Sequence, residues 1–237
     1  METALQNIPA SSHPTPLESQ WLNAISPKDF IRNNKNFNTL MMRYRCAIRE
    51  LQTKLEVLDD EFSANNQRNP ISSIKSRIKS PNSIYEKLRR RDLPFTEESI
   101  VQNLDDVAGI RVICPFISDI YTIADLIKSQ DDINILKVKD YIASPKPNGY
   151  RSYHMIVEVP VFFTEGKVPM RAEIQIRTIG MDFWASVDHQ LRYKKKIKAD
   201  KDIEGIERAL LKCAETVTAT DKHMEEIKDM IGEFEDI

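Results

Sequence analysis

Apolar residues near the start of the sequence recur every three to four positions. The stripe comprises Phe37, Leu40, Tyr44, Ile48, Leu51, Leu55, Leu58 and Phe62. This spacing gathers apolar side chains on one face of an α-helix. A polar run that ends in proline follows it at residues 65–70. The pattern predicts a long amphipathic helix in an N-terminal helical segment, residues 26–69.

A second stripe occupies the other end of the chain, residues 201–237. Its positions follow the a/d spacing of about four heptads, at Ile203, Ile206, Leu210, Cys213, Val217, Thr220, Met224, Ile227 and Ile231. The spacing predicts a second long amphipathic helix. Each terminal helix could pack on the domain between them, or both could join subunits in a helical layer.

The middle of the chain, residues 70–200, alternates between two hydrophobic periodicities. Strands are predicted at 109–114, 135–142, 152–160 and 170–178, and helices at 116–129 and 183–193. A turn at 165–167 joins two of the strands. Strands interleaved with helices, together with a turn-connected strand pair, predict an α/β (α+β) domain with a mixed sheet flanked by helices.

The bulk composition excludes several classes of protein. A net charge of −2 provides no basic field, so nothing indicates RNA or DNA binding. The three cysteines form no Cys-x-x-Cys pair, which argues against a zinc site or a disulfide scaffold. Residues 1–25 have proline and polar residues but no secretory pattern, and predict a flexible leader. No apolar run reaches the roughly 18 residues of a membrane span, so we expect a cytoplasmic protein.

The region 75–91 concentrates positive charge. Its seven cations are Lys75, Arg77, Lys79, Lys87, Arg89, Arg90 and Arg91, and its only acidic residue is Glu86. Asn82 or Ser83 is expected to start a helix, because Ser83 and Glu86 have capping-box spacing. Ser83, Lys87 and Arg90 would then line one face. A helix start with a cationic stripe suits a polyphosphate; the alternative is a solvated basic surface.

Two carboxylates, Asp105 and Asp106, precede the strand at 109–114. Oxygen ligands at a strand end suit Mg²⁺, which is a hard cation. Gly109 would allow close backbone approach at the same place. The two carboxylates could equally cap a turn.

Two further strings place polar side chains on strand-patterned segments. In the first, Tyr150 and His154 share one face with Ser152 because side chains alternate along a strand. In the second, the shared polar face comprises Arg171, Glu173, Gln175 and Arg177, opposite the apolar Ala172, Ile174 and Ile176. Either polar face could simply be solvated, and a lone histidine is more often packed than catalytic.

Absent motifs narrow the chemistry. The sequence contains no G-x-x-x-x-G-K-[ST] string, so a bound ATP would not be held by a P-loop. It contains no His-Asp dipeptide either, so the usual metal-dependent HD phosphohydrolase site is not expected.

Taken together, the strings resemble the synthetase domain of the RelA/SpoT family over roughly residues 70–195. The matching strings are Arg77-Ile-Lys79, Ser83-Ile-Tyr-Glu-Lys87, Asp106-Val-Ala-Gly-Ile-Arg111, Lys139-Asp-Tyr-Ile142, Lys146-Pro-Asn-Gly-Tyr150 with His154, and Glu173-Ile-Gln-Ile-Arg-Thr178. Long members add hydrolase and regulatory domains for which this sequence has no room. It therefore resembles a stand-alone small alarmone synthetase, and Met181-Asp-Phe-Trp-Ala185 resembles the RelP type.

The resemblance implies a nucleotidyltransferase-like fold and a defined reaction. The β,γ-pyrophosphate of ATP would pass to the 3′-hydroxyl of GDP or GTP, giving AMP and ppGpp or pppGpp, the alarmones of the stringent response. No hydrolase activity is expected. The basic segment Lys137-Val-Lys139-Asp140 leans towards GDP as acceptor. The resemblance also implies a homotetramer assembled through the terminal helices.

Residue roles follow from the same resemblance. ATP would be bound by Arg77, Lys79, Ser83, Lys87, Arg90 and Arg111, with the two flanking arginines stacked on adenine. GDP or GTP would be bound by Lys146, Tyr150, His154, Gln175 and Arg177. Asp106 and Glu173 would be the catalytic residues and the Mg²⁺ ligands, and Glu173 would also accept the proton of the 3′-hydroxyl.

Two other functions are compatible with parts of the sequence. A nucleotidyltransferase would move AMP and release pyrophosphate, but it leaves the Tyr150–His154 string without a purpose. A non-catalytic regulator could bind nucleotides or single-stranded RNA with the same aromatic and basic groups. Such a binder has no need of the paired carboxylates Asp106 and Glu173.

Overall fold

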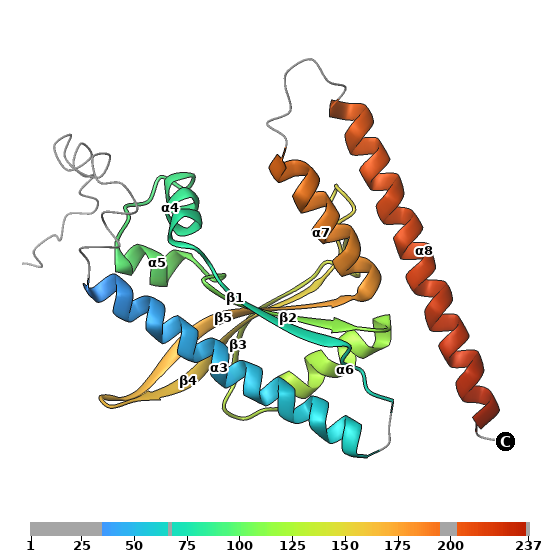
Figure 1. Cartoon of the computed structure of the whole chain (residues 1–237), viewed down its shortest axis with the longest axis horizontal. Helices are drawn as coiled ribbons and strands as arrows, with labels where there is room; N and C mark the ends of the chain where they lie inside the picture. The colour runs from blue at the N-terminus through green and yellow to red at the C-terminus, as the bar shows by residue number, and fades with distance from the viewer. Residues whose placement is uncertain (1–34, 66–67, 195–202, 236–237) are drawn as a thin grey trace, which may run out of the picture.

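The computed structural model describes residues 35–65, 68–194 and 203–235. A five-stranded sheet forms its centre (Figure 1). The strands are β1 (Ser73–Ile78), β2 (Ala108–Cys114), β3 (Asn134–Asp140), β4 (Tyr153–Phe163) and β5 (Gly166–Thr178), in the order β1-β2-β5-β4-β3. The central pair β2 and β5 is parallel and the other pairs are antiparallel. The predicted mixed sheet is confirmed, and the predicted leader lies outside the described residues.

Strand ends differ from the sequence prediction for local reasons. β3 stops at Asp140, two residues early, because its Oδ1 accepts hydrogen bonds from the backbone N–H groups of Ile142 and Ala143. β4 and β5 are longer than predicted. Pro160 and Pro169 were expected to end the strands, but they face each other across the ladder, and pairing continues beyond them to Phe163 and Gly166. The turn therefore falls at residues 164–165, one position earlier than expected.

Two elements were not predicted. β1 exposes most of its polar and charged side chains at the edge of the sheet, and it forms by pairing with β2. The seven-residue helix α5 (Glu97–Asn103) begins at Thr96, whose hydroxyl accepts a hydrogen bond from the backbone N–H of Ser99. Short or charged segments of this kind carry little periodic signal, so tertiary contacts decide them.

The apolar face of the sheet is covered by α3 (Lys35–Ala64) and α6 (Ile117–Lys128). The predicted N-terminal stripe turns inward, and Phe37, Tyr44 and Leu51 are almost completely buried. Each such side chain contributes roughly 1.5–3 kcal/mol of burial free energy. They pack with the sheet in a single core. The first of the two uses considered for this helix, packing on its own domain, is therefore the observed one.

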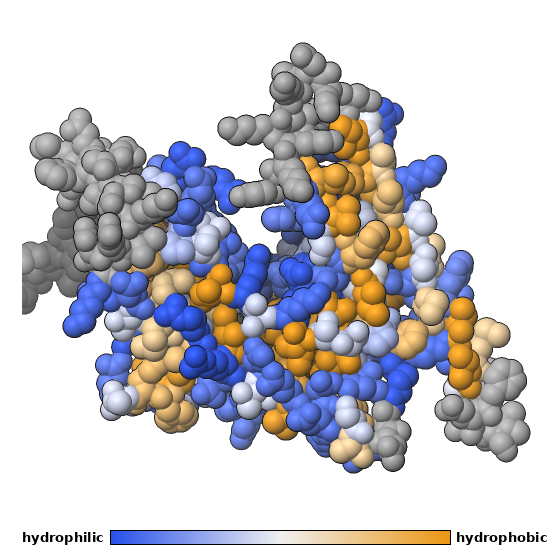
Figure 2. Space-filling model, in the orientation of Figure 1, coloured by the Kyte–Doolittle hydropathy of each residue, from blue (hydrophilic) through white to orange (hydrophobic). Residues whose placement is uncertain are grey.

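The C-terminal stripe behaves differently. α7 (Ile179–Lys194) follows β5 directly, and α8 (Ile203–Glu235) stands beside α7 and α6 (Figure 1). Leu210 and Val217 are partly buried, whereas Met224, Ile227 and Ile231 are exposed. Hydrophobic side chains are visible along α7 and α8 in Figure 2. Much of the predicted heptad stripe therefore faces away from its own domain.

None of the helices within the described residues combines the length and the apolar character that a bilayer span requires.

Candidate active site

The strand register aligns polar residues into a row across one face of the sheet. Lys75 pairs with Arg111, Arg111 with Gln175, and Gln175 with His154. Residues paired across neighbouring strands point to the same side. The face opposite the core therefore carries a continuous polar row drawn from four strands, which the alternation within β5 had predicted for a single strand.

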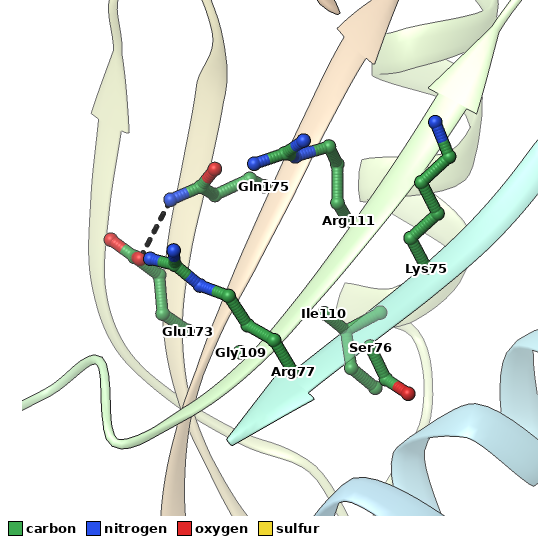
Figure 3. Close-up of a pocket in the computed structure, with 8 residues that line it drawn as sticks. All are labelled: Lys75, Ser76, Arg77, Gly109, Ile110, Arg111, Glu173 and Gln175. Atoms are coloured by element: carbon green, nitrogen blue, oxygen red, sulfur yellow. Dashed lines mark hydrogen bonds between the residues drawn. The ribbon is translucent and has the colours of Figure 1, made fainter. Parts of the chain in front are cut away.

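A second row lies beside the first. Arg77 pairs with Gly109, and Gly109 pairs with Glu173. A Cβ atom on Gly109 would lie 3.6 Å from the Arg77 Cγ atom. The side chain of Arg77 extends over Gly109 on β2 towards Glu173 (Figure 3). Side chains of two non-adjacent strands therefore point to the same part of this face.

A cleft follows these two rows. One cavity of about 170 Å³ is lined by Lys75, Ser76, Arg77, Gly109, Ile110, Arg111, Glu173 and Gln175. A larger hollow of about 680 Å³ shares Arg77, Arg111 and Gln175 with it and reaches α7. The combined space is large enough for nucleotides, and its walls include the cations Lys75, Arg77, Arg111 and Arg177.

The helix α4 (Pro81–Arg89) begins earlier than predicted, because its N-cap precedes both Asn82 and Ser83. Ser80 is the N-cap, and its Oγ atom accepts a hydrogen bond from the Ser83 backbone N–H at 3.2 Å. Pro81 occupies the first helical position, where its missing N–H is not needed. The capping role assigned to Asn82 or Ser83 was therefore wrong. Ser83 instead turns its hydroxyl to that of Ser80, 2.8 Å away.

Two predicted ATP-binding lysines meet the first predicted carboxylate. Lys79 Nζ lies 2.9 Å from Asp106 Oδ2, and Lys87 Nζ lies 2.8 Å from Asp106 Oδ1. Burial acts to raise the pKa of Asp106, but the two lysines outweigh it and lower the pKa to about 2. Asp105 points elsewhere and binds Arg171.

Arg90 does not join this group. It forms the C-cap of α4, it is exposed, and its Nε atom donates to the Glu86 carbonyl at 3.4 Å. The helical spacing had placed Arg90 on the same face as Lys87. The helix ends before Arg90, so of these two cations only Lys87 reaches Asp106.

A closed ring of hydrogen bonds surrounds the second predicted carboxylate. Glu173 Oε1 lies 3.1 Å from His154 Nδ1, and its Oε2 accepts from Gln175 Nε2 at 2.8 Å. His154 Nε2 lies 2.8 Å from the Tyr150 hydroxyl. Arg177 closes the ring, because its Nη2 atom donates to both Tyr150 and Gln175 at 2.7 Å. All five predicted residues are in direct contact.

The pKa shifts indicate which group donates and which accepts in the hydrogen bonds of this ring. Burial raises the pKa of Glu173, but hydrogen bonds from His154 and Gln175 bring it below its ordinary value. Burial also lowers the pKa of His154, against the effect of Glu173. At neutral pH an ionised Glu173 therefore accepts from Nδ1–H, and a neutral His154 accepts from the Tyr150 hydroxyl through Nε2.

The Tyr150 ring is surrounded by cations and a second aromatic ring. Lys146 Nζ lies 4.7 Å from the Tyr150 ring centroid and 4.6 Å from that of Tyr141. The Arg177 guanidinium lies 5.2 Å from the same Tyr150 centroid. Burial, and then the charge of Lys139, lowers the pKa of Lys146. An aromatic face with cations beside it suits a base and its phosphates.

One residue of the site was missed by the sequence analysis. Asp182 on α7 is buried, and its Oδ1 accepts from Arg111 at 2.9 Å and from Arg177 at 3.3 Å. Lys75 Nζ lies 3.4 Å from Oδ2. Asp182 belongs to a string that marked the RelP type, but helical spacing alone could not show that it faces the sheet.

Comparison with known proteins decides the family. The model for a region found in RelA/SpoT proteins matches residues 76–198. The chain belongs to the RelA/SpoT family. It is 47% identical over 154 residues to the GTP pyrophosphokinase YwaC of Bacillus subtilis (strain 168), covering 65% of this chain and 73% of YwaC.

Solved structures place this RelA/SpoT family member among the small alarmone synthetases. Small alarmone synthetase 2 of Bacillus subtilis is 41% identical, with a TM-score of 0.74 over 83% of this chain and 100% of that one. Small alarmone synthetase 1 of the same organism, bound to its product pppGpp, is 32% identical, with a TM-score of 0.76 over 84% of this chain and 99% of that one.

Proposed function

We propose that this RelA/SpoT family member is a GTP pyrophosphokinase. It transfers the β,γ-pyrophosphate of ATP to the 3′-hydroxyl of GDP or GTP and releases AMP. The observation that carries the assignment is the position of Glu173, which borders the Arg77 cavity and is also part of the Tyr150 hydrogen-bonded ring. One carboxylate therefore lies between two sites of nucleotide-binding character.

ATP occupies the side formed by β1, β2 and α4. Arg77 and Arg111 line both cavities and offer guanidinium planes on which adenine stacks. Lys79 and Ser83 lie at the start of α4, where the helix dipole favours phosphates. Lys87 in the last turn of α4 adds a second positive charge beside Asp106. Arg90 at the far end of α4 supplies charge at longer range rather than a direct contact.

The acceptor occupies the side formed by β4, β5 and the loop before β4. Guanine stacks on Tyr150, and Lys146 contacts the 5′-phosphates as a cation. His154 and Gln175 orient Glu173, while Arg177 fixes the tyrosine and the glutamine together. Lys139, which pairs with His154 across the sheet, adds positive charge and favours GDP as the acceptor.

The reaction is a direct displacement at the β-phosphorus of ATP. The acceptor 3′-oxygen forms a new bond to the β-phosphorus. The bond between the β-phosphorus and the oxygen that bridges it to the α-phosphate breaks, and that oxygen leaves as part of AMP. Glu173 accepts the 3′-hydroxyl proton, and both its oxygens are already held in position by His154 and Gln175. Lys79 and Lys87 balance the negative charge of the transferred group.

Mg²⁺ is the cofactor that fits these residues. Besides burial, the charge of Asp106 acts to raise the pKa of Glu173, so the two carboxylates are close enough to interact. Within the described residues no group of three His, Cys, Asp or Glu could hold a metal. Mg²⁺ is commonly held by one or two carboxylates together with substrate phosphates. When bound, it neutralises charge on those phosphates.

We also propose a homotetramer in the cytoplasm, where ATP and GTP are available. Of the terminal helices predicted to join the subunits, α3 packs on its own domain, so the interface is assigned to the C-terminal side. The support is the exposed apolar surface on α7 and α8. It includes Phe183, Val187, Met224, Ile227, Met230 and Ile231. A helical face of this kind is more often an interface than a solvated surface. Light scattering on the purified protein measures the number of subunits directly.

Glu173→Gln tests the reaction. The protein is incubated with γ-labelled ATP, Mg²⁺ and GDP, GTP or GMP, and the nucleotides are separated. We expect labelled guanosine tetra- or pentaphosphate with an equal amount of AMP, and a loss of about 10²–10⁴-fold in the variant with ATP and GDP binding retained. Glu158→Gln, a glutamate change on the same hairpin but outside the cavities, is the control.

The same assay separates the alternatives. Release of pyrophosphate instead of AMP would identify a nucleotidyltransferase. Nucleotide binding without any transfer would identify a non-catalytic binder. Chelation of divalent cations is expected to abolish transfer, and activity that survives chelation would contradict the Mg²⁺ assignment.

A further inference from the structure

α8 contacts the end of β5 through a buried carboxylate. Asp221 Oδ2 accepts a hydrogen bond from the Thr178 hydroxyl at 2.7 Å, and both side chains are buried. The Thr178 hydroxyl in turn accepts from the Met181 backbone N–H at 3.0 Å. Thr178 directly follows Arg177 in the sequence. The carboxylate on α8 therefore holds the backbone position next to a predicted acceptor-binding arginine.

The same helix contacts the residues on both sides of Tyr150. Gly149 has φ of +83°, and a Cβ atom there would lie 2.5 Å from the Ala214 Cβ on α8. Arg151 is buried and lines a small cavity together with Asp221. Its Nε and Nη1 atoms have no hydrogen-bond partner within the described residues. The charge of Asp221 faces this guanidinium.

A third close approach lies between these two. A Cβ atom on Gly180 would lie 2.7 Å from the Asp221 Oδ1 atom. Glycine at this position therefore lets the carboxylate reach Thr178 at the start of α7. Residues 149, 151 and 178–180 therefore all lie against two turns of α8, between Ala214 and Asp221.

The two residues flanked by these contacts touch each other. Arg177 donates to the Tyr150 hydroxyl at 2.7 Å and lies over its ring. Most of the ATP side has a different support, because its residues lie on β1, β2 and α4, whereas α8 packs mainly on α7 and α6. Among the proposed ATP-binding residues that the structure describes, only Arg111 is bonded to α7, through Asp182. A change in α8 packing should therefore act on one half of the site.

We propose that Asp221 is a positioning residue for the guanosine acceptor: by binding Thr178 and facing Arg151, it places Arg177 and Tyr150 relative to each other. The inference rests on the proposed function for the identity of the acceptor. Asp221 is not a catalytic residue, because it lies behind the acceptor residues and touches neither cavity of the cleft.

Asp221→Asn tests this role against Asp229→Asn, the same change at an exposed position of α8. Initial rates give kcat and separate KM values for ATP and GDP. We expect Asp221→Asn to raise the KM for GDP about tenfold, equivalent to about 1.4 kcal/mol, with the KM for ATP within about twofold of the wild type. Asp229→Asn should match the wild type.

Thr178 provides a second pair of variants in case Asp221→Asn does not fold. Thr178→Val removes the hydroxyl at nearly constant volume, and Thr178→Ser retains it. The proposal requires the valine variant to show the same selective rise in the KM for GDP. The serine variant should have the KM for GDP of the wild type. Equal increases in both KM values, or folded Asp221→Asn and valine variants with unchanged KM for GDP, would overturn the proposal.

Calorimetric titration of GDP without ATP separates this proposal from the function. If the wild type transfers no pyrophosphate, yet binds GDP more tightly than Asp221→Asn does, the reaction is wrong and the positioning role stands. If the wild type transfers pyrophosphate and both proteins bind GDP equally, the reaction stands and the positioning role is wrong.

Discussion

His154 and Glu173 lie on neighbouring antiparallel strands with Nδ1 3.1 Å from Oε1, and the imidazole is buried. The pair joins the Tyr150 hydroxyl to the carboxylate that we propose as the base. Because Glu173 is ionised and His154 is neutral at pH 7, every hydrogen bond in the chain points towards Glu173. This order holds the carboxylate in place while leaving it unprotonated.

The lowered pKa of His154 predicts a pH-dependent stability. Burial, opposed by Glu173, places the folded-state pKa below the ordinary 6.5. Between these two pKa values the unfolded chain binds more protons than the native protein. The contribution of His154 to the free energy of unfolding is therefore fully present above pH 6.5 and is lost as the pH falls towards the folded-state pKa. The free energy of unfolding in urea should therefore fall more between pH 7 and 5.5 in the wild type than in His154→Gln. The exposed His223→Gln is the control, and equal pH slopes in all three proteins would contradict the assignment.

Tyr150 combines two contributions that separate by substitution. Tyr150→Phe retains the stacking face but loses the hydroxyl that binds Arg177 and His154, so we expect a severalfold lower kcat with a modest change in the KM for the acceptor. Tyr150→Ala also loses base stacking, which contributes about 1–3 kcal/mol. The KM for GDP should then rise roughly ten- to hundredfold, while the KM for ATP stays the same. If alanine and phenylalanine have equal effects, guanine does not stack on this ring.

Asp182 is expected to support the fold as well as the site. Asp182→Ala leaves Arg177, which is 5% exposed, without its nearest carboxylate. Loss of one partner from a buried pair costs about 3–5 kcal/mol. Asp125→Ala removes an exposed pair with Lys128 and should cost under about 1 kcal/mol. Urea unfolding at one fixed protein concentration compares them, and a similar small cost for both would show that Asp182 is dispensable to folding.

Ser80 and Ser83 should differ in what they support. Ser80→Ala removes the N-cap of α4 and should lower stability by about 1 kcal/mol, with little change in kcat. Ser83→Ala leaves the cap in place but removes a hydroxyl from the proposed phosphate side, so the KM for ATP should rise instead. Thermal unfolding and initial rates on both variants decide this, and the reverse pattern would restore Ser83 as the cap.

Strand periodicity predicted much of the polar face. Glu173, Gln175 and Arg177 alternate with Ile174 and Ile176, and the structure places the two sets on opposite sides of β5. Alternation is a local property of the extended chain, so it is readable without knowing the partners of the strand. The inward face of α3 was predictable for the same reason, because the 3–4 spacing of its apolar residues continues over many helical turns, from Phe37 to Phe62.

The misses are features that depend on other parts of the chain. Ser80 was not recognised as the cap because Ser83 and Glu86 have an equally good local pattern. Arg90 was placed with Lys87 because helical spacing does not reveal where the helix stops. β1 is a charged edge strand that exists by pairing with β2, and its sequence resembles a loop.

The sequence by itself determined the family, the alternating faces and most of the residue types that bind nucleotides, because motifs and periodicity are written into consecutive positions. Only the tertiary structure decided which of these residues meet. Arg77 extends over Gly109 towards Glu173 (Figure 3), Asp182 binds Arg111 and Arg177, and Asp221 contacts Thr178 from a helix more than forty residues along the chain. Such contacts follow from strand register and helix docking, which depend on long-range packing and leave no local signal.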